Sequence, residues 1–323
     1  MNLIICTSPL QILIAEKIIE RHSNEAFFSV VIADTFNAKY LQYYERLRMV
    51  SRKALLIQDK QGVLFRLLYH CLFRAGHIDK VFLASINKQL LHRLLELIRP
   101  REIYTFDDGT ANIVSTGFFN QEDAPRRLGI LHKLMGLHAS DLYNTSRIKS
   151  MSLKHYTIYP GLKNIVSPTE VINLFDNASP KGLTDDTPVK VLLGQALTYD
   201  DTDLNERLAE WVIRKFGIDL YLPHPKEWYK VSGVEYIDTP LIFEDYYSRY
   251  LAHRPCTIYT FCSSAAFNIL ANRHKTQIIA LKPWLVTNPS LLECYERFKE
   301  AGVTTIDVSE ADLNTHMHAH THT

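Results

Sequence analysis

The sequence lacks the features of a membrane-spanning, secreted or nucleic-acid-binding chain. No apolar run approaches the roughly 20 residues that a transmembrane helix needs. Residues 1–6 enter an apolar run at once, without the basic segment and cleavage site of a signal peptide. The 36 Lys and Arg nearly balance the 35 Asp and Glu, so the net charge of +1 favours no nucleic-acid partner. We therefore expect a cytoplasmic protein.

Cysteine is also scarce. The five cysteines are odd in number and have no Cys-x-x-Cys spacing, so a disulfide framework and a zinc centre both lose support. Free thiols in a reducing compartment are the simpler interpretation. The sequence has no Gly-x-Gly-x-x-Gly, Walker A, Gly-x-Ser-x-Gly or His-Glu-x-x-His motif either. We expect no metal and no cofactor.

What the sequence does contain is a repeated alternation of apolar β-type runs with helical patterns. This alternation is typical of α/β domains with parallel sheets. The length of 323 residues favours two such domains, here predicted at 1–175 and 188–312, with a polar linker near 176–187. Strands are predicted at 3–6, 27–33, 80–85, 103–106, 189–193, 218–222, 257–261 and 277–281. The expected fold is two Rossmann-like domains facing a cleft.

Two segments fit this pattern less well. Residues 125–151 predict one or two helices without clear bounds. The tail at 313–323 alternates histidine with other residues and has the composition of a disordered end. Adventitious metal chelation by its histidines is the alternative.

Three polar motifs each follow a predicted strand directly. They are Asp107-Asp108-Gly109, His224-Pro225 and Ser263-Ser264. Ligands bind at the carboxyl ends of strands in open α/β sheets, so these positions predict a site. A carboxylate base, an imidazole acid and hydroxyls beside a helix start are suited to transfer chemistry on a phosphate-bearing substrate. Two further acidic groups, at 200–203 and at 244–245, follow other runs.

Each motif also has a plain structural interpretation. Asp-Asp-Gly is a common turn, an isolated histidine is often partly buried without a chemical role, and serine is a frequent helix N-cap. Capping explains part of the cluster Asp200, Asp201 and Asp203, and Glu244 suits the start of a helix. The order of the motifs along the chain favours the site.

Several segments together resemble the lipooligosaccharide sialyltransferases of glycosyltransferase family 52, found in Neisseria, Haemophilus and Pasteurella. The segments that carry the resemblance are 2–11, 106–112, 155–165, 192–195, 223–225, 243–246 and 259–264. They cover nearly the whole chain in the same order. The resemblance implies a modified two-domain GT-B fold and an inverting, metal-independent reaction. It also implies CMP-N-acetylneuraminate as donor and a terminal galactose as acceptor. We predict an α2,3 linkage, and at the level of sequence α2,6 stays open as the alternative.

The resemblance also implies roles for single residues. His224 would contact the CMP phosphate and act as acid, Ser263 and Ser264 would hold that phosphate, and Glu244 would take the ribose. The family base corresponds to Asp201; distant sialyltransferases place theirs at Asp108, and Asp200 is a further option because the loop here is longer. The remaining predicted substrate-binding residues are Gly194, Gln195, Pro225, Asp107 and Gly109.

The same resemblance places the acceptor on domain 1–175 and CMP-sialate on domain 188–312. It implies a homodimer, and any contact with the inner membrane would be peripheral. Two alternatives remain open at the level of sequence. The chain is a glycosyltransferase for another nucleotide sugar, or it is a non-catalytic module that binds a nucleotide sugar or glycan.

Overall fold

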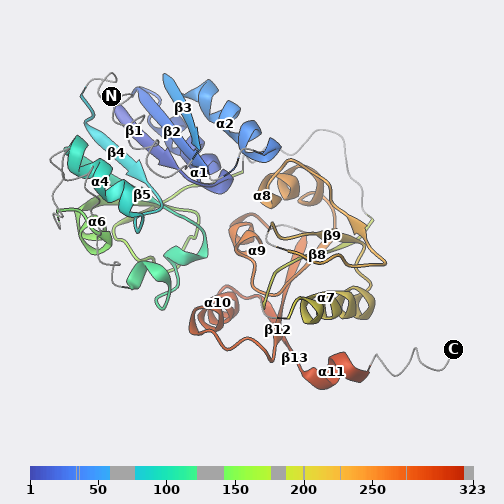
Figure 1. The fold of residues 1–323 in the computed structure, drawn as a ribbon. Helices are drawn as coiled ribbons and strands as arrows, with labels where there is room; N and C mark the ends of the chain where they lie inside the picture. Colours follow the sequence, from blue (N-terminus) through green and yellow to red (C-terminus); the bar gives the residue numbers. More distant parts are fainter. Residues whose placement is uncertain are drawn as a thin grey trace. The chain divides into compact units, whose positions relative to one another are not determined.

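The chain folds into two compact units, Met1–Leu174 (unit 1) and Phe175–Thr323 (unit 2), each built around one parallel sheet (Figure 1). The structure is a computed structural model, and it describes residues 1–33, 35, 37–58, 77–121, 142–175, 187–198, 201–225, 227–273 and 275–315. None of the helices in these ranges combines the length and apolar character needed to cross a membrane.

Unit 1 contains a seven-stranded sheet in the order β3-β2-β1-β4-β5-β6-β7, and every neighbouring pair is parallel. Its strands are β1 (Asn2–Cys6), β2 (Phe27–Ala33), β3 (Lys53–Gln58), β4 (Lys80–Leu83), β5 (Glu102–Phe106), β6 (Ser152–Thr157) and β7 (Thr169–Val171). Strands β1 and β2 are buried along their whole length, which is why their sequences are apolar on both faces.

Helices cover this sheet, and short polar turns start them. Ser8 caps α1 (Pro9–Arg21) by accepting from the Gln11 N–H at 3.3 Å. Helix α2 (Ala38–Val50) packs against α1, and α4 (Gln89–Ile98) contributes Leu91, Leu94 and Leu95 to the core beneath the sheet. Each such leucine contributes about 1.5–3 kcal/mol through burial. The remaining helical elements are α6 (Thr145–Met151), η1 (Thr110–Asn112) and η2 (Phe118–Asn120).

Unit 2 repeats the design with a six-stranded parallel sheet in the order β10-β9-β8-β11-β12-β13. Its strands are β8 (Val189–Leu193), β9 (Leu220–Leu222), β10 (Glu235–Tyr236), β11 (Cys256–Thr260), β12 (Thr276–Pro283) and β13 (Thr304–Val308). Its helical elements are α7 (Thr202–Phe216), α8 (Phe243–Tyr246), η3 (Tyr247–Leu251), α9 (Ser264–Asn268), η4 (Leu270–Asn272), α10 (Pro289–Glu300) and α11 (Glu310–Thr315).

The predicted two-domain α/β architecture is confirmed, and every predicted strand is present with bounds that differ by at most two residues. The strand predicted at 218–222 begins only at Leu220. The Ile218 N–H bonds to the Ile213 carbonyl at 3.0 Å and, with the left-handed Gly217 (φ 59°), still closes the end of α7. The cleft between the domains stays a prediction.

Other sequence predictions fall partly outside the described residues. The linker at 176–186, Asp200, residues 122–141 and the tail from 316 lie there. The tail prediction was wrong for 313–315, because these residues end α11; Ser309 and Asp312 bond to each other at the start of this helix. Four of the five cysteines lie in the described part, and all four are buried and form no disulfide there, as expected.

Candidate functional site

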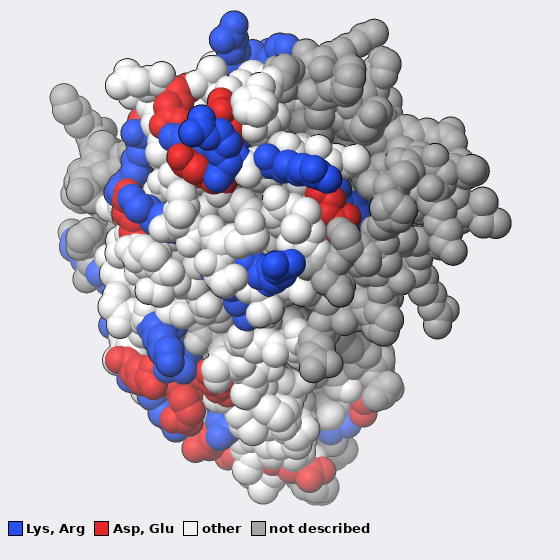
Figure 2. All heavy atoms as spheres, turned by 90° about the vertical axis from the view of Figure 1, so that its left-hand side faces the viewer, with Lys and Arg blue, Asp and Glu red and all other residues white. Residues whose placement is uncertain are grey.

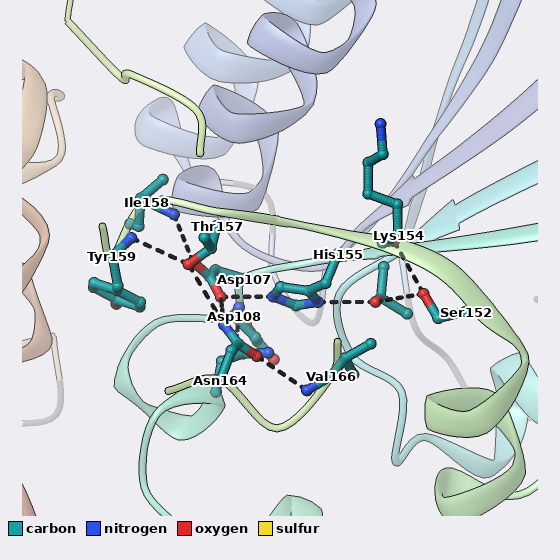
Figure 3. Close-up of polar contacts among 12 residues, drawn as sticks. Asp107, Asp108, Ser152, Lys154, His155, Thr157, Ile158, Tyr159, Asn164 and Val166 are labelled. Carbon is teal, nitrogen blue, oxygen red and sulfur yellow. Dashed lines mark hydrogen bonds and ion pairs between the residues drawn. The ribbon is translucent and has the colours of Figure 1, made fainter. Parts of the chain in front are cut away.

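Asp107 lies at the carboxyl end of β5 and is completely enclosed (Figure 3). Its Oδ1 accepts from His155 Nε2 at 2.8 Å and from Asn164 Nδ2 at 3.0 Å. Its Oδ2 accepts from the Thr157 hydroxyl and the Ile158 N–H, both at 2.7 Å. Four donors satisfy the carboxylate, as a buried charge requires. Asp107 therefore orders the loop, and its contact with substrate stays a prediction.

His155 extends this network between β5 and β6 to Thr105 and Ser152. Its Nδ1 and Thr105 Oγ1 are hydrogen-bonded at 2.8 Å, and Thr105 Oγ1 and Ser152 Oγ are hydrogen-bonded at 2.9 Å. Ser152 Oγ also donates to the Lys154 carbonyl at 3.0 Å. Both ring nitrogens of His155 therefore have a hydrogen-bond partner within this network.

Asp108 turns the opposite way from its neighbour, toward the ends of β1 and β4. Its carboxylate accepts from Gln11 Nε2 and from the Ser85 hydroxyl, the latter at 3.2 Å. Burial raises the pKa of Asp108 above its ordinary value, and the hydrogen bonds from Gln11 and Ser85 and the charge of Lys88 only partly oppose this. A carboxylate with a raised pKa at a strand end has the chemistry of a general base.

Gly109 sets the direction of the chain after this doublet. Its φ of 85° with ψ of −159° suits glycine and strains other residues. The next turn is fixed by Asn112, whose Oδ1 accepts from the Asp108 N–H at 2.6 Å. Gly109 itself is buried, so its part in the site is to shape the backbone.

In unit 2, three predicted segments lie at adjacent strand ends. Strand β8 pairs with β9 on one side and with β11 on the other. Gly194 and Gln195 follow β8, His224 and Pro225 follow β9, and Ser263 and Ser264 follow β11. Because all three strands are parallel, their carboxyl ends meet at one edge of the sheet. The structure thus brings together six of the predicted residues.

Gln195 ties these segments to one another. Its side-chain Oε1 accepts from the Cys262 N–H at 3.0 Å, and its carbonyl oxygen accepts from the Tyr229 hydroxyl at 3.3 Å. The Gly194 N–H bonds to the Leu222 carbonyl at 2.8 Å. The end of β8 therefore holds the loops after both neighbouring strands.

Glu227 secures the loop that carries His224. The Tyr221 hydroxyl donates to Glu227 Oε2 at 2.8 Å, and the Glu227 N–H bonds to the His224 carbonyl at 2.9 Å. Glu227 Oε1 and the Tyr221 hydroxyl fill the space that a side chain on Gly194 would need. Oε1 is buried without a hydrogen-bond partner in the described part of the chain, and burial raises the pKa of Glu227.

The serines lie where β11 passes into α9. The Ser263 N–H donates to Thr260 Oγ1 at 2.9 Å, and Ser263 Oγ caps the helix by accepting from the Ala265 N–H at 3.3 Å. The half-buried Ser264 hydroxyl makes no hydrogen bond within the described residues, so it is available to a ligand.

The two remaining acidic residues serve the structure in visible ways. Asp201 is exposed and caps α7, accepting from the Leu204 N–H at 2.8 Å. Glu244 is buried at the start of α8 and accepts from Asn268 Nδ2 at 2.6 Å. Capping and charge at a helix start, the plain interpretations, are thus present in both cases.

Charges on the outer face of unit 1 are mixed in sign. In Figure 2 acidic and basic side chains lie in adjoining groups with uncharged surface between them. Unit 1 also contains ion pairs, for example Lys154 with Glu170 at 2.5 Å and Lys80 with Glu25 at 2.9 Å. The described part of this surface therefore has no extended patch of a single charge sign.

Sequence reasoning missed several residues of these clusters. Gln11 and Ser85 reach Asp108 from 97 and 23 residues away, and Glu227 has its partners on two different strands. The spacing of three between His224 and Glu227 is the one local signal that was present.

Known proteins resemble this chain over most of its length. The pattern of glycosyltransferase family 52 matches residues 24–285. The "CMP-N-acetylneuraminate:beta-galactoside alpha-2,3-sialyltransferase" of Pasteurella multocida is 39% identical over 96% of this chain and all of its own length. The "N-acetyllactosaminide alpha-2,3-sialyltransferase" of Haemophilus influenzae is 36% identical over 94% of this chain and 98% of its own.

Among solved structures, TcCGT1 in complex with UDP superposes with a TM-score of 0.55 at 9% identity, covering 95% of this chain and 85% of that one. This likeness concerns the fold alone and agrees with a GT-B-like pair of parallel-sheet units. With the family pattern spanning most of its length, the chain is a glycosyltransferase and belongs to glycosyltransferase family 52.

Proposed function

We propose that the protein transfers N-acetylneuraminate from CMP-N-acetylneuraminate to a terminal β-galactoside, forming an α2,3 linkage. The observation that carries this proposal is the 39% identity to the Pasteurella alpha-2,3-sialyltransferase over that protein's full length. The natural acceptor we propose is a galactose-terminated lipooligosaccharide or related glycan.

The donor site we propose is the edge of the unit 2 sheet at the ends of β9, β8 and β11. As the bond between the sugar and CMP breaks, negative charge accumulates on the phosphate oxygens. His224 would donate a proton or hydrogen bond to this phosphate, and Ser264 would donate its available hydroxyl. Ser263 would add its hydroxyl hydrogen, because its oxygen serves the helix cap as an acceptor. Glu244 would take the ribose hydroxyls.

Two carboxylates compete for the role of base. Asp201 follows β8, next to the strand that leads to His224, and its exposed side chain is open to an acceptor hydroxyl. Asp108 is held in place by Gln11 and Ser85, and burial raises its pKa above the ordinary value of an aspartate, which suits a base. We propose Asp201, as the family resemblance implies, with Asp108 as the alternative. Attack of the galactose oxygen on the face opposite CMP would invert the anomeric centre.

The experiment that tests the function is CMP release from CMP-N-acetylneuraminate, with and without lactose, in EDTA. We expect release that depends on lactose, together with α2,3-sialyllactose as product. Release that requires an added divalent cation would overturn metal independence. A folded protein that binds CMP but turns over no galactoside would instead be a binding module. Turnover with a UDP- or GDP-sugar alone would reassign the donor.

We further propose that the protein works as a homodimer in the cytoplasm, with at most peripheral contact with the inner membrane. Sedimentation of the purified protein, and its partition between the soluble and membrane fractions of cells, test these two points. A monomer at micromolar concentration contradicts the first, and retention in membranes after a high-salt wash contradicts the second.

A further inference from the structure

Trp228 is the most exposed large apolar side chain in the described residues, with 83% of its surface open to solvent. It lies four residues after His224, in the loop that leaves β9. Single exposed apolar side chains are common and need no special explanation. Two features distinguish Trp228 from that background: it follows a turn in which the Glu227 N–H bonds to the carbonyl of the proposed acid, His224, at 2.9 Å, and its loop is fixed.

The residues on both sides of Trp228 are anchored to the sheet. Before it, Glu227 accepts from the Tyr221 hydroxyl at 2.8 Å and packs over Gly194. After it, the Tyr229 hydroxyl donates to the Gln195 carbonyl at 3.3 Å. With the side chains at 227 and 229 turned inward, the one between them is turned outward. The indole is therefore presented to solvent by a fixed backbone.

A fixed, exposed indole is suited to a ligand with a flat apolar face. The ring of Trp offers a large contact area, and its loop has little further conformational entropy to lose on binding. A pyranose ring such as galactose has such a face, formed by its axial C–H groups, and its hydroxyls stay in water. A nucleobase is the other flat candidate, but nucleotide sites are concave and enclose the ligand, whereas this side chain is open.

We propose that Trp228 is the stacking platform for the pyranose ring of the acceptor, so that a neutral β-galactoside binds on its indole beside His224. This inference rests on the proposed function, and it adds an acceptor contact on unit 2 that the sequence did not indicate. No covalent step is involved. The indole contributes binding and orientation only.

The test compares Trp228→Ala and Trp228→Phe with the wild-type enzyme. We expect Trp228→Ala to raise the KM for lactose about tenfold, and Trp228→Phe to restore most of the loss, because a smaller aromatic face remains. The Kd for CMP and the slow hydrolysis of CMP-N-acetylneuraminate without acceptor should stay within twofold of wild type. Tyr250→Ala is the matched control, since Tyr250 is also an exposed aromatic residue of unit 2 but precedes β11, at the opposite edge of the sheet.

Three results would overturn the inference. They are an unchanged KM for lactose in Trp228→Ala, an equal rise in Tyr250→Ala, or a weaker Kd for CMP, which would make Trp228 part of the nucleotide site. A binding measurement separates these from a failure of the proposed function. Tryptophan fluorescence of the wild type, titrated with lactose in the presence of CMP, should change, and this change should be lost in Trp228→Phe whether or not the enzyme turns over.

Discussion

His155 Nε2 donates to Asp107 Oδ1 over 2.8 Å, and neither side chain is exposed to solvent. This pair joins the ends of β5 and β6, and it leaves the following residue, Asp108, as the carboxylate that faces the opposite direction. Two adjacent acids thus have separate tasks: one supports the loop and the other is available for chemistry. The two tasks predict different phenotypes for the same change of acid to amide.

Asp107→Asn should destabilise unit 1. The amide replaces an oxygen that accepts hydrogen bonds with a group that donates them, so at least one of the four buried donors around Asp107 loses its acceptor. Leaving a buried donor without a partner costs about 1–3 kcal/mol. We expect hydrogen exchange of peptides that cover β5 and β6 to speed up markedly, and the urea midpoint to fall.

Asp108→Asn is the matched control, because it makes the same chemical change one residue away. Gln11 and Ser85 both have partners besides Asp108, so its loss should cost about 1 kcal/mol or less. Equal destabilisation by the two substitutions would contradict the division of tasks.

Whether a strand could be predicted from the sequence depended on how completely it is buried. Strand β2 was predicted with its observed bounds because all seven of its residues are buried and all except Ser29 are apolar. The strands that were missed, β3, β7, β10 and β13, all lie at sheet edges, where exposed polar residues break the pattern. Strand β6 is internal but was missed too, because its Ser152 and His155 are buried polar residues of the Asp107 network.

The predictions of the site residues had the same limit. Local order placed Asp107, His224 and Ser263 at strand ends, because strand and loop are neighbours in sequence. It did not show which of two adjacent aspartates is enclosed, since that depends on residues 48 and 97 positions away. Glu227 was missed because a single glutamate in a polar loop forms no recognisable pattern. Its role depends on contacts with Tyr221 on β9 and with Gly194 directly after β8.

His224→Ala should lower kcat by about 10²–10⁴, the range for a lost acid–base group. CMP binding should fall much less, because Ser263 and Ser264 remain. The measurement is kcat with saturating donor and acceptor, alongside calorimetric titration with CMP. Glu227 and Gln195 hold the backbone of this loop, so the variant should keep the wild-type unfolding curve. Turnover at the wild-type rate would remove His224 from the mechanism.

The identity of the base can be tested through Ser85. Its hydroxyl bonds to Asp108 at 3.2 Å and lowers the pKa of that carboxyl, whose overall shift is upward because of burial. If Asp108 is the base, Ser85→Ala should move the acidic limb of kcat/KM to higher pH, because a base must be deprotonated to act. If Asp201 is the base, that limb should stay where it is, and Asp201→Asn should lower kcat by about 10²–10⁴ with Asp108→Asn close to wild type.

Glu227→Gln should change the dependence of stability on pH. Burial raises the pKa of Glu227 in the folded state above the unfolded value near 4.5, so the folded protein holds this proton more tightly. The contribution of Glu227 to the free energy of unfolding is therefore fully present below about pH 4.5, and it is lost as the pH rises through the pKa of the folded state. The amide does not ionise and still offers an oxygen to the Tyr221 hydroxyl. We expect the variant to gain Tm relative to wild type at pH 8 and to show little difference at pH 4.

Glu210→Gln is the control with the opposite sign. The hydrogen bonds from Ser232 and Arg214 outweigh burial and lower the pKa of Glu210, so this change should cost stability above pH 4.5. A Glu227→Gln difference that is independent of pH would contradict the raised pKa, because it would mean that Glu227 has the same pKa in the folded and unfolded protein.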